Sequence, residues 1–266
     1  MTRVNYTVCM RLVTTKSYKL AVYEKGDPHA ALCAIVLPGR LESKDYTHIT
    51  SHVDTLAGLG FHAIAFDPPG SWESPGDIDT YTVTNYLGAV NELVAHYGNK
   101  PTVLVGHSLG GSIAALAAAS NLHVIAYVAL MSLVSGPSTS DDPAWKSEGK
   151  ITFSRDLPPG DHHTATQKKY DLPYSFFEDA LTYDTKRALH SCHKPKLFVL
   201  GKHDSQNAAS YPAEEYARIA EPKRLIEIDS PHSYRYHKTI IDEVNAHIKE
   251  FVLSLPPKEN RTPARG

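Results

Sequence analysis

The amino-acid sequence predicts an α/β protein whose mainly parallel central sheet carries helices on both faces, with an inserted helical cap. Short, continuously apolar runs alternate with segments in which apolar side chains recur every three or four residues; these are the patterns of buried strands and of amphipathic helices. Such alternation favours a parallel sheet, because each helix crosses back over the sheet to reach the next strand. The length of 266 residues, 42% of them hydrophobic, is enough for one such domain.

The first half of the chain contains the opening strands and most of the expected sheet. Two opening segments lie on either side of a short turn and should pair antiparallel, whereas the later runs are apolar throughout, as in strands covered on both faces. Gly58 and Gly60 mark the end of the first helix. The expected strands are residues 6–15, 19–25, 32–37, 61–66, 101–105 and 124–130, and the expected helices are residues 45–59, 81–97 and 109–120.

The second half begins with a change of pattern. Over residues 131–195 proline, serine, aspartate, histidine and tyrosine become frequent and the apolar periodicity fades. Because this segment is too long for a simple loop, we expect an inserted cap of short helices, including residues 176–190. The core then comprises residues 1–130 and 196–255, and the polar tail 256–266 should be disordered. The remaining core elements are strands at 196–200 and 224–228 and helices at 213–220 and 239–253.

Composition and charge exclude several classes of partner. The formal net charge is −2, so neither nucleic acid nor an anionic membrane surface is an expected partner. No apolar run approaches the length of a membrane span. Cys9, Cys33 and Cys192 are too few for a disulfide framework, and the first residues lack the apolar core of a signal peptide. We therefore expect a cytoplasmic protein.

A G-x-S-x-G motif lies where an expected strand becomes an expected helix. It is formed by Gly106, His107, Ser108, Leu109 and Gly110. In this context the serine occupies a sharp turn that holds its hydroxyl clear of the sheet, and the flanking glycines avoid collisions with neighbouring backbone. The motif could also be a glycine-rich connector without chemistry, but the strand–helix context favours Ser108 as a nucleophile.

A serine nucleophile needs a base and an orienting carboxylate. Asp204 and His232 each follow the end of an expected strand, where functional residues of parallel sheets gather. Their order along the chain, serine, then aspartate, then histidine, matches the order that accompanies this motif. Asp204 could instead be a turn or cap residue. His237 is the rival base and Asp229 the rival acid, both less well placed.

Two main-chain N–H groups are expected to form the oxyanion hole. One belongs to Leu109, at the start of the helix that follows Ser108. The other belongs to Arg40, which follows Gly39 in the loop after strand 32–37; Pro38 has no N–H, and Leu41 is the alternative donor. The Arg40 side chain is either solvated or in contact with an anionic part of the substrate.

The motifs resemble those of the α/β-hydrolase fold family, in particular its serine esterases, lipases and aminopeptidase-like hydrolases. The matching stretches are residues 106–111, 201–204 and 230–232, together with 67–74, which resembles the family's D-x-x-G-x-G-x-S loop. The resemblance covers nearly all of residues 17–253. It implies the fold, a catalytic triad of serine, histidine and aspartate, and hydrolysis through an acyl-enzyme.

The sequence departs from the family pattern at two places. Pro38-Gly39 stands where His-Gly is usual in the oxyanion loop, and Trp72 replaces the second glycine of the loop that begins at Asp67. Neither change removes a reacting group. Ser108 itself argues against the dehalogenase and epoxide-hydrolase branches, which use an aspartate at this position.

Substrate contacts are expected from His107 beside the nucleophile, from Trp72 at the pocket entrance and from aromatic residues of the cap, among them Phe176 and Phe177. Four further histidines do not form a compact metal motif, which needs three or four converging ligands. These are His162, His163, His190 and His193. We therefore expect no metal and no other cofactor.

Together these features predict a serine hydrolase that cleaves small-molecule carboxylic esters with small to medium acyl chains. The alternatives are an amide or peptide hydrolase resembling iminopeptidases, an acyltransferase, and a slow-turnover ligand receptor on the same fold. An acidic patch in the cap, from Glu178, Asp179 and Asp184, would favour an amine-bearing amide substrate. The oligomeric state is not predicted.

Overall fold

The central sheet has eight strands in the order β1-β2-β4-β3-β5-β6-β9-β10 in the computed structural model, which describes residues 9–132, 143–205 and 213–256. The pairs β1–β2 and β2–β4 are antiparallel and all other pairs are parallel. The strands are β1 (Cys9–Thr14), β2 (Lys19–Lys25), β3 (Cys33–Leu37), β4 (His62–Phe66), β5 (Thr102–His107), β6 (Val124–Leu130), β9 (Lys196–His203) and β10 (Lys223–Pro231).

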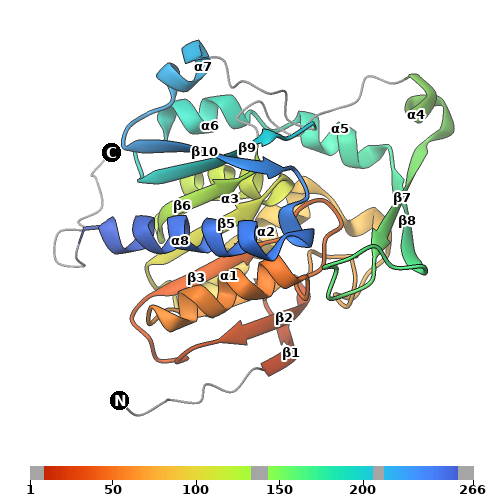
Figure 1. Cartoon of the computed structure of the whole chain (residues 1–266). Helices are drawn as coiled ribbons and strands as arrows, with labels where there is room; N and C mark the ends of the chain where they lie inside the picture. Colours follow the sequence, from red (N-terminus) through yellow and green to blue (C-terminus); the bar gives the residue numbers. More distant parts are fainter. Residues whose placement is uncertain (1–8, 133–142, 206–212, 257–266) are drawn as a thin grey trace.

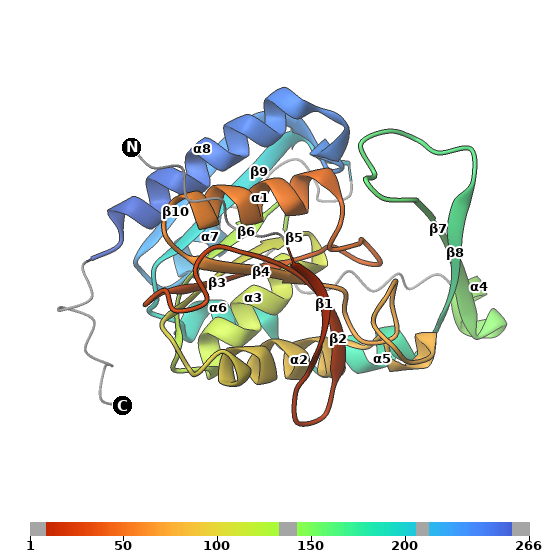
Figure 2. The same ribbon diagram turned by 90° about the horizontal axis from the view of Figure 1, so that it is seen from below.

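Helices cover both faces of this sheet (Figures 1 and 2). On one face α1 (Thr47–Gly58) packs beside α8 (Lys238–Ser254), and their apolar side chains share one core cluster. On the other face α2 (Val83–His96) and α3 (Leu109–Ser120) belong to a second cluster. The remaining helix of the core region is α7 (Ala213–Arg218), and short 3-10 helices occupy Ile78–Thr80 and Tyr234–Tyr236. The predicted fold class is confirmed.

The fully apolar runs form the middle of the sheet. Every residue of β3, β4 and β5 is buried, because helices cover both faces there. Three strands continue beyond the predicted ends: β5 to His107, β9 to His203 and β10 to Pro231. These extensions are missed by an apolar pattern because they carry the polar residues at the carboxyl ends of the strands. Residues 6–8 of the first expected strand lie outside the described residues.

The segment between β6 and β9 contains helices and a separate two-stranded sheet. The helices are α4 (Pro143–Glu148), α5 (Ser175–Leu181) and α6 (Thr185–Ser191), and the antiparallel strands are β7 (Lys150–Asp156) and β8 (Gln167–Pro173). The sequence analysis expected only helices here. The hairpin stands beyond the carboxyl ends of the central strands (Figure 1), whereas α6 packs against α3. Residues 133–142 and the expected tail from 257 onward lie outside the described residues.

None of the helices within the described ranges combines the length and apolar character needed to cross a membrane.

A buried histidine joins α1 to the segment before α8. The ring of His52 is within 2.6 Å of Asn245 Oδ1 through Nδ1 and within 2.7 Å of the Tyr234 hydroxyl through Nε2. The amide oxygen can only accept, so Nδ1 carries the proton and Nε2 accepts from the tyrosine. Burial lowers the pKa of His52 to about 3, and the charge of His48 acts in the same direction. The folded protein therefore keeps His52 neutral.

We expect the free energy of unfolding to fall as the pH is lowered from 6.5 towards 3. In this window the unfolded chain binds a proton at His52 that the folded protein does not, so acid favours unfolding. Between pH 6.5 and pH 5 the loss from one such group is about 1.5 kcal/mol. Urea denaturation over this pH range measures the effect. The free energy of unfolding of His52→Gln should depend less steeply on pH than that of wild type, and an identical pH dependence would contradict a neutral, buried His52.

Candidate active site

Ser108 lies at the turn between β5 and α3. Its backbone has φ 52° and ψ −120°, a conformation that non-glycine residues rarely adopt and that is found where function requires it. The turn is held in the sheet by the Ser108 N–H, which donates to the carbonyl of Leu130 on β6 at 2.8 Å. The side chain is half-buried. The strained turn therefore presents the hydroxyl at the carboxyl end of the sheet.

Glycines at 106 and 110 allow this turn to form. A Cβ at Gly106 would lie 2.1 Å from the carbonyl oxygen of Gly110, and one at Gly110 would lie 2.2 Å from the carbonyl oxygen of Leu37. Both clashes are with backbone, which cannot swing aside as a side chain can. The predicted reason for glycine at both positions is thereby confirmed.

Gly106→Ala is expected to lower the free energy of unfolding by about 3 kcal/mol, because its methyl group can be placed only by moving the turn. Gly58→Ala is the matched control, since a Cβ on that helical glycine meets nothing within 4 Å. Chemical denaturation of both variants measures the difference. Equal stabilities for the two variants would contradict the packing argument.

The structure brings Ser108, His232 and Asp204 into one hydrogen-bonded chain. Ser108 Oγ lies 3.0 Å from His232 Nε2, and His232 Nδ1 lies 2.8 Å from Asp204 Oδ2. An ionised carboxylate only accepts, so Nδ1 carries a proton and Nε2 is the bare nitrogen that faces the serine hydroxyl. His232 and Asp204 are both buried. In this tautomer His232 can take the serine proton.

The rival residues lie elsewhere. Asp229 pairs with His203 at 2.7 Å, and both side chains are largely exposed. His237 precedes α8 as its N-terminal flanking residue.

The loop after β3 contains Arg40, whose N–H is one of the two expected oxyanion donors, and Leu41, the alternative donor. The Gly39 N–H donates to Glu42 Oε2 at 2.8 Å, and the Leu41 N–H donates to the Tyr81 hydroxyl at 2.8 Å. The alternative donor Leu41 is therefore engaged. Within the described ranges, no hydrogen bond uses the main-chain N–H of Arg40 or of Leu109. These two N–H groups are therefore able to donate hydrogen bonds to a substrate oxygen.

The loop that begins at Asp67 braces this oxyanion loop. The buried Asp67 carboxylate accepts from the N–H of Lys44 at 2.8 Å and from the N–H of Glu73 at 3.2 Å. Trp72, which stands in place of a glycine, has a φ of 49°, the left-handed conformation that glycine adopts without strain. Its Nε1–H donates to the carbonyl of Leu41 at 2.9 Å. Trp72 thus ties the two loops together.

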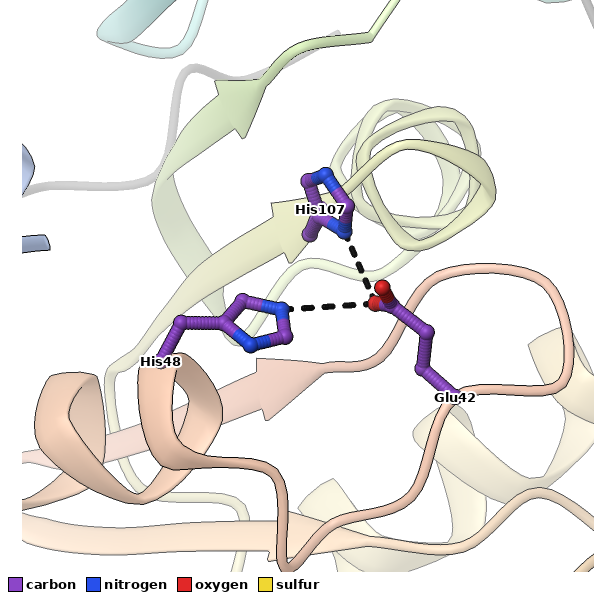
Figure 3. A group of neighbouring side chains, drawn as sticks. All are labelled: Glu42, His48 and His107. Atoms are coloured by element: carbon purple, nitrogen blue, oxygen red, sulfur yellow. Dashed lines mark hydrogen bonds and ion pairs between the residues drawn. The ribbon is translucent and has the colours of Figure 1, made fainter. Parts of the chain in front are cut away.

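A buried cluster of Glu42, His48 and His107 lies next to the site (Figure 3). His107 Nδ1 is 2.8 Å from Glu42 Oε2, and His107 Nε2 is 3.1 Å from the carbonyl oxygen of His232. Both partners are acceptors, so His107 donates from both nitrogens and is cationic. Burial opposes this charge, but Glu42 raises the pKa of His107 above its usual value. His107 therefore anchors the backbone of His232.

The same cluster is the converging set of metal-ligand types among the described residues, with its ligand atoms within 4.8 Å of one another. Protein groups already balance its charge: His107 donates to the carboxylate, and Arg235 Nη1 lies 3.5 Å from Glu42 Oε1. The geometry favours a buried ion network over a cation site. The cluster contains none of His162, His163, His190 and His193.

A cavity of about 450 Å³ opens beside Ser108 and His232. Its other walls come from the oxyanion loop, from β7 and the hairpin loop, and from the segment before α8. His107 lies in the wall, whereas Trp72, Phe176 and Phe177 do not. Both phenylalanines are buried against the Arg40 side chain. A substrate contact by Trp72, Phe176 or Phe177 therefore stays a prediction, without support from this cavity.

Two of the three acidic residues proposed for an amine-bearing substrate have other roles. Asp179 accepts hydrogen bonds from the N–H and hydroxyl of Thr84, and Asp184 caps α6 by accepting from the Arg187 N–H. Neither these two nor Glu178 lies in the cavity wall.

Sequence reasoning named Ser108, His232 and Asp204, which the structure brings together, but it missed the residues that support them. Glu42 holds the oxyanion loop from within, whereas Tyr81 and Arg235 reach the loop and the Glu42 carboxylate from distant parts of the chain. The one available signal was the position of Glu42, three residues after the expected Gly39 turn.

Comparisons with known proteins agree with this topology. A family model described as alpha/beta hydrolase fold matches residues 35–153. No curated protein matches the sequence significantly.

Several solved structures are similar over almost their entire length. Est1E from Butyrivibrio proteoclasticus, solved with ferulic acid bound, has 21% identity and a TM-score of 0.70, with 91% of this chain and 98% of that chain covered. The alpha/beta hydrolase domain-containing protein 10 from mouse has 20% identity and a TM-score of 0.70, with 93% and 100% covered. The esterase Pf2001 from Pyrococcus furiosus has 18% identity and a TM-score of 0.64, with 93% and 92% covered. The sheet order, the family match and these structures together show that this protein has the α/β-hydrolase fold.

Proposed function

We propose that the protein is a serine hydrolase that cleaves carboxylic esters of small to medium acyl chains through an acyl-enzyme. The observation that carries this proposal is the hydrogen-bonded chain from Asp204 through His232 to Ser108, ending at the cavity. Esterases are among the similar structures, which supports a hydrolase. The His232 tautomer and the positions of all three residues suit acyl transfer.

The reaction follows from this geometry. Ser108 Oγ attacks the ester carbonyl while His232 Nε2 takes the hydroxyl proton, and Asp204 stabilises the imidazolium that forms. The N–H groups of Arg40 and Leu109 hold the oxygen that becomes negative. His232 then gives its proton to the departing alcohol, leaving an ester on Ser108. Water, deprotonated by His232, attacks this ester and releases the acid and the serine.

The cavity supports a small-molecule substrate. Its volume of about 450 Å³ falls within the range of sites for such ligands. Residues of β7 and of the hairpin loop form part of its wall, which supports a role for the cap, residues 131–195, in selecting the acyl chain. No described contact favours the amide hydrolase, acyltransferase or receptor alternatives. The cytoplasmic location also stays a prediction.

A series of p-nitrophenyl esters from acetate to decanoate tests the proposal. We expect turnover that peaks at short or medium chains and falls at the long end, with a burst of p-nitrophenol where release of the acid is the slow step. The proposal would be overturned if every ester resisted hydrolysis and an alkyl fluorophosphonate failed to react.

A further inference from the structure

We propose that Arg40 and Arg155 form an anion subsite in the cavity beside Ser108, and that the preferred substrate is an ester that also carries a carboxylate. This inference rests on the proposed hydrolase function and names its substrate class.

The Arg40 side chain is a largely buried cation. Its guanidinium carbon lies 5.6 Å, 5.9 Å and 5.7 Å from the ring centres of Phe153, Phe176 and Phe177, so three aromatic rings contact it. Its Nε is buried without a hydrogen-bond partner, and among the described residues no carboxylate forms an ion pair with it. Cation–π contacts offset only part of the cost of burying a charge. The three aromatic rings therefore do not balance the charge of Arg40, and a bound anion would stabilise it.

A second arginine side chain contacts the backbone of Arg40. Arg155 on β7 donates from Nε and Nη2 to the carbonyl oxygen of Arg40, at 3.1 Å and 3.0 Å, and from Nη1 to the carbonyl of Ser154. These acceptors are neutral, and in the part of the chain that the structure describes no carboxylate forms an ion pair with Arg155. Burial lowers the pKa of the Arg40 guanidinium, and the charge of Arg155 lowers it further. Two cations in the wall of one cavity repel each other, and an anion bound by both would offset that repulsion.

The third arginine of the cavity wall provides a contrast. Arg235 lies 2.8 Å from Asp156 and 3.5 Å from Glu42, so its charge is matched within the protein. The unmatched positive charge is therefore specific to the pair formed by Arg40 and Arg155.

The position of this pair suits a substrate with two functional groups. Arg40, Arg155, Ser108 and His232 all lie in the wall of the same cavity. The main-chain N–H of Arg40 is the proposed oxyanion donor, and its side chain extends from the same residue. One residue would thus hold the ester oxygen with its backbone and the carboxylate with its guanidinium, whose fork matches a carboxylate in two hydrogen bonds.

Two pairs of esters, each differing in one negative charge, test this inference. The first pair is p-nitrophenyl monoglutarate and its methyl ester, which place the charge on the acyl side. The second pair is 4-acetoxybenzoate and its methyl ester, which place it on the leaving group. In at least one pair we expect kcat/KM of wild type to be about tenfold to a hundredfold higher for the anion, as for a hydrogen bond to a charged group. This preference should shrink as sodium chloride is added.

Substitutions connect the preference to the arginine. Arg40→Met should bring the ratio of anionic to neutral kcat/KM close to one, and Arg40→Lys should retain part of it. Arg224→Met is the matched control, because Arg224 is exposed, is paired with Glu250 and lies at the opposite end of β10 from His232. It removes the same formal charge and should leave the ratio as in wild type.

Binding of glutarate and of benzoate to wild type, measured by calorimetry, gives a readout that does not need turnover. We expect one of them to bind and Arg40→Met to lose that binding. Neutral esters hydrolysed as fast as anionic ones in both pairs, or a ratio that Arg40→Met leaves unchanged, would overturn the subsite while the esterase proposal stands. Failure of all esters would reject the esterase proposal, and absence of carboxylate binding would then reject the subsite separately.

Discussion

Ser108→Ala is expected to lower the kcat of ester hydrolysis by a factor of about 10⁶, the scale seen when the nucleophile of a triad is removed. The alanine variant retains the cavity, His232 and the oxyanion donors, but no atom remains to form the acyl-enzyme. The fold should persist, since the only described hydrogen bond of Ser108 Oγ is to His232. Steady-state kinetics with a p-nitrophenyl ester measure the loss, and thermal unfolding reports the fold.

Ser120→Ala provides the matched control. Ser120 is exposed at the last turn of the same helix, where its hydroxyl donates to the carbonyl of Leu116. The Ser120→Ala variant should hydrolyse the ester at the wild-type rate. Turnover by Ser108→Ala within tenfold of wild type would reject Ser108 as the nucleophile.

Asp204→Asn should lower kcat by a factor of about 10⁴. The new amide can donate towards His232 Nδ1, which places the ring proton on Nε2, and a protonated Nε2 cannot accept the proton of Ser108. The effect should be in kcat more than in KM, because the tautomer changes the chemical step rather than the cavity. Steady-state kinetics on the preferred ester separate the two parameters.

Asp229→Asn is the matched control for this substitution. Asp229 is the other aspartate near His232 in the sequence, but it pairs with His203, and both exposed side chains lie near the ends of β10 and β9. It should retain wild-type kcat. A large loss in Asp229→Asn together with a small loss in Asp204→Asn would reverse the assignment of the acid.

The central sheet could be predicted from the sequence because β3, β4 and β5 are buried on both faces, which requires continuous apolar runs. The chain positions of Ser108, Asp204 and His232 were readable for a related reason: each follows a strand, and parallel strands bring their carboxyl ends together. These positions can therefore be recognised from the residues that directly follow each predicted strand. The sequence order then narrowed the choice among aspartates and histidines.

Other features depend on contacts between distant segments. The β7–β8 hairpin has alternating exposure and many polar residues, so it lacks the apolar run of a core strand. The Leu41 N–H, the alternative oxyanion donor, donates to the hydroxyl of Tyr81, forty residues away. The contact of Phe176 and Phe177 with the Arg40 side chain likewise could not be predicted from the sequence. The apolar pattern of a segment predicts which of its side chains are buried, but it does not predict which distant residues they contact.

The most direct test of the central claim is the mass of the protein after reaction with an alkyl fluorophosphonate. If Ser108 is the activated nucleophile, wild type should gain one phosphonyl group, peptide mapping should locate it on Ser108, and Ser108→Ala should gain none. A wild-type protein that remains unmodified, or that carries the label on another residue, would contradict the account.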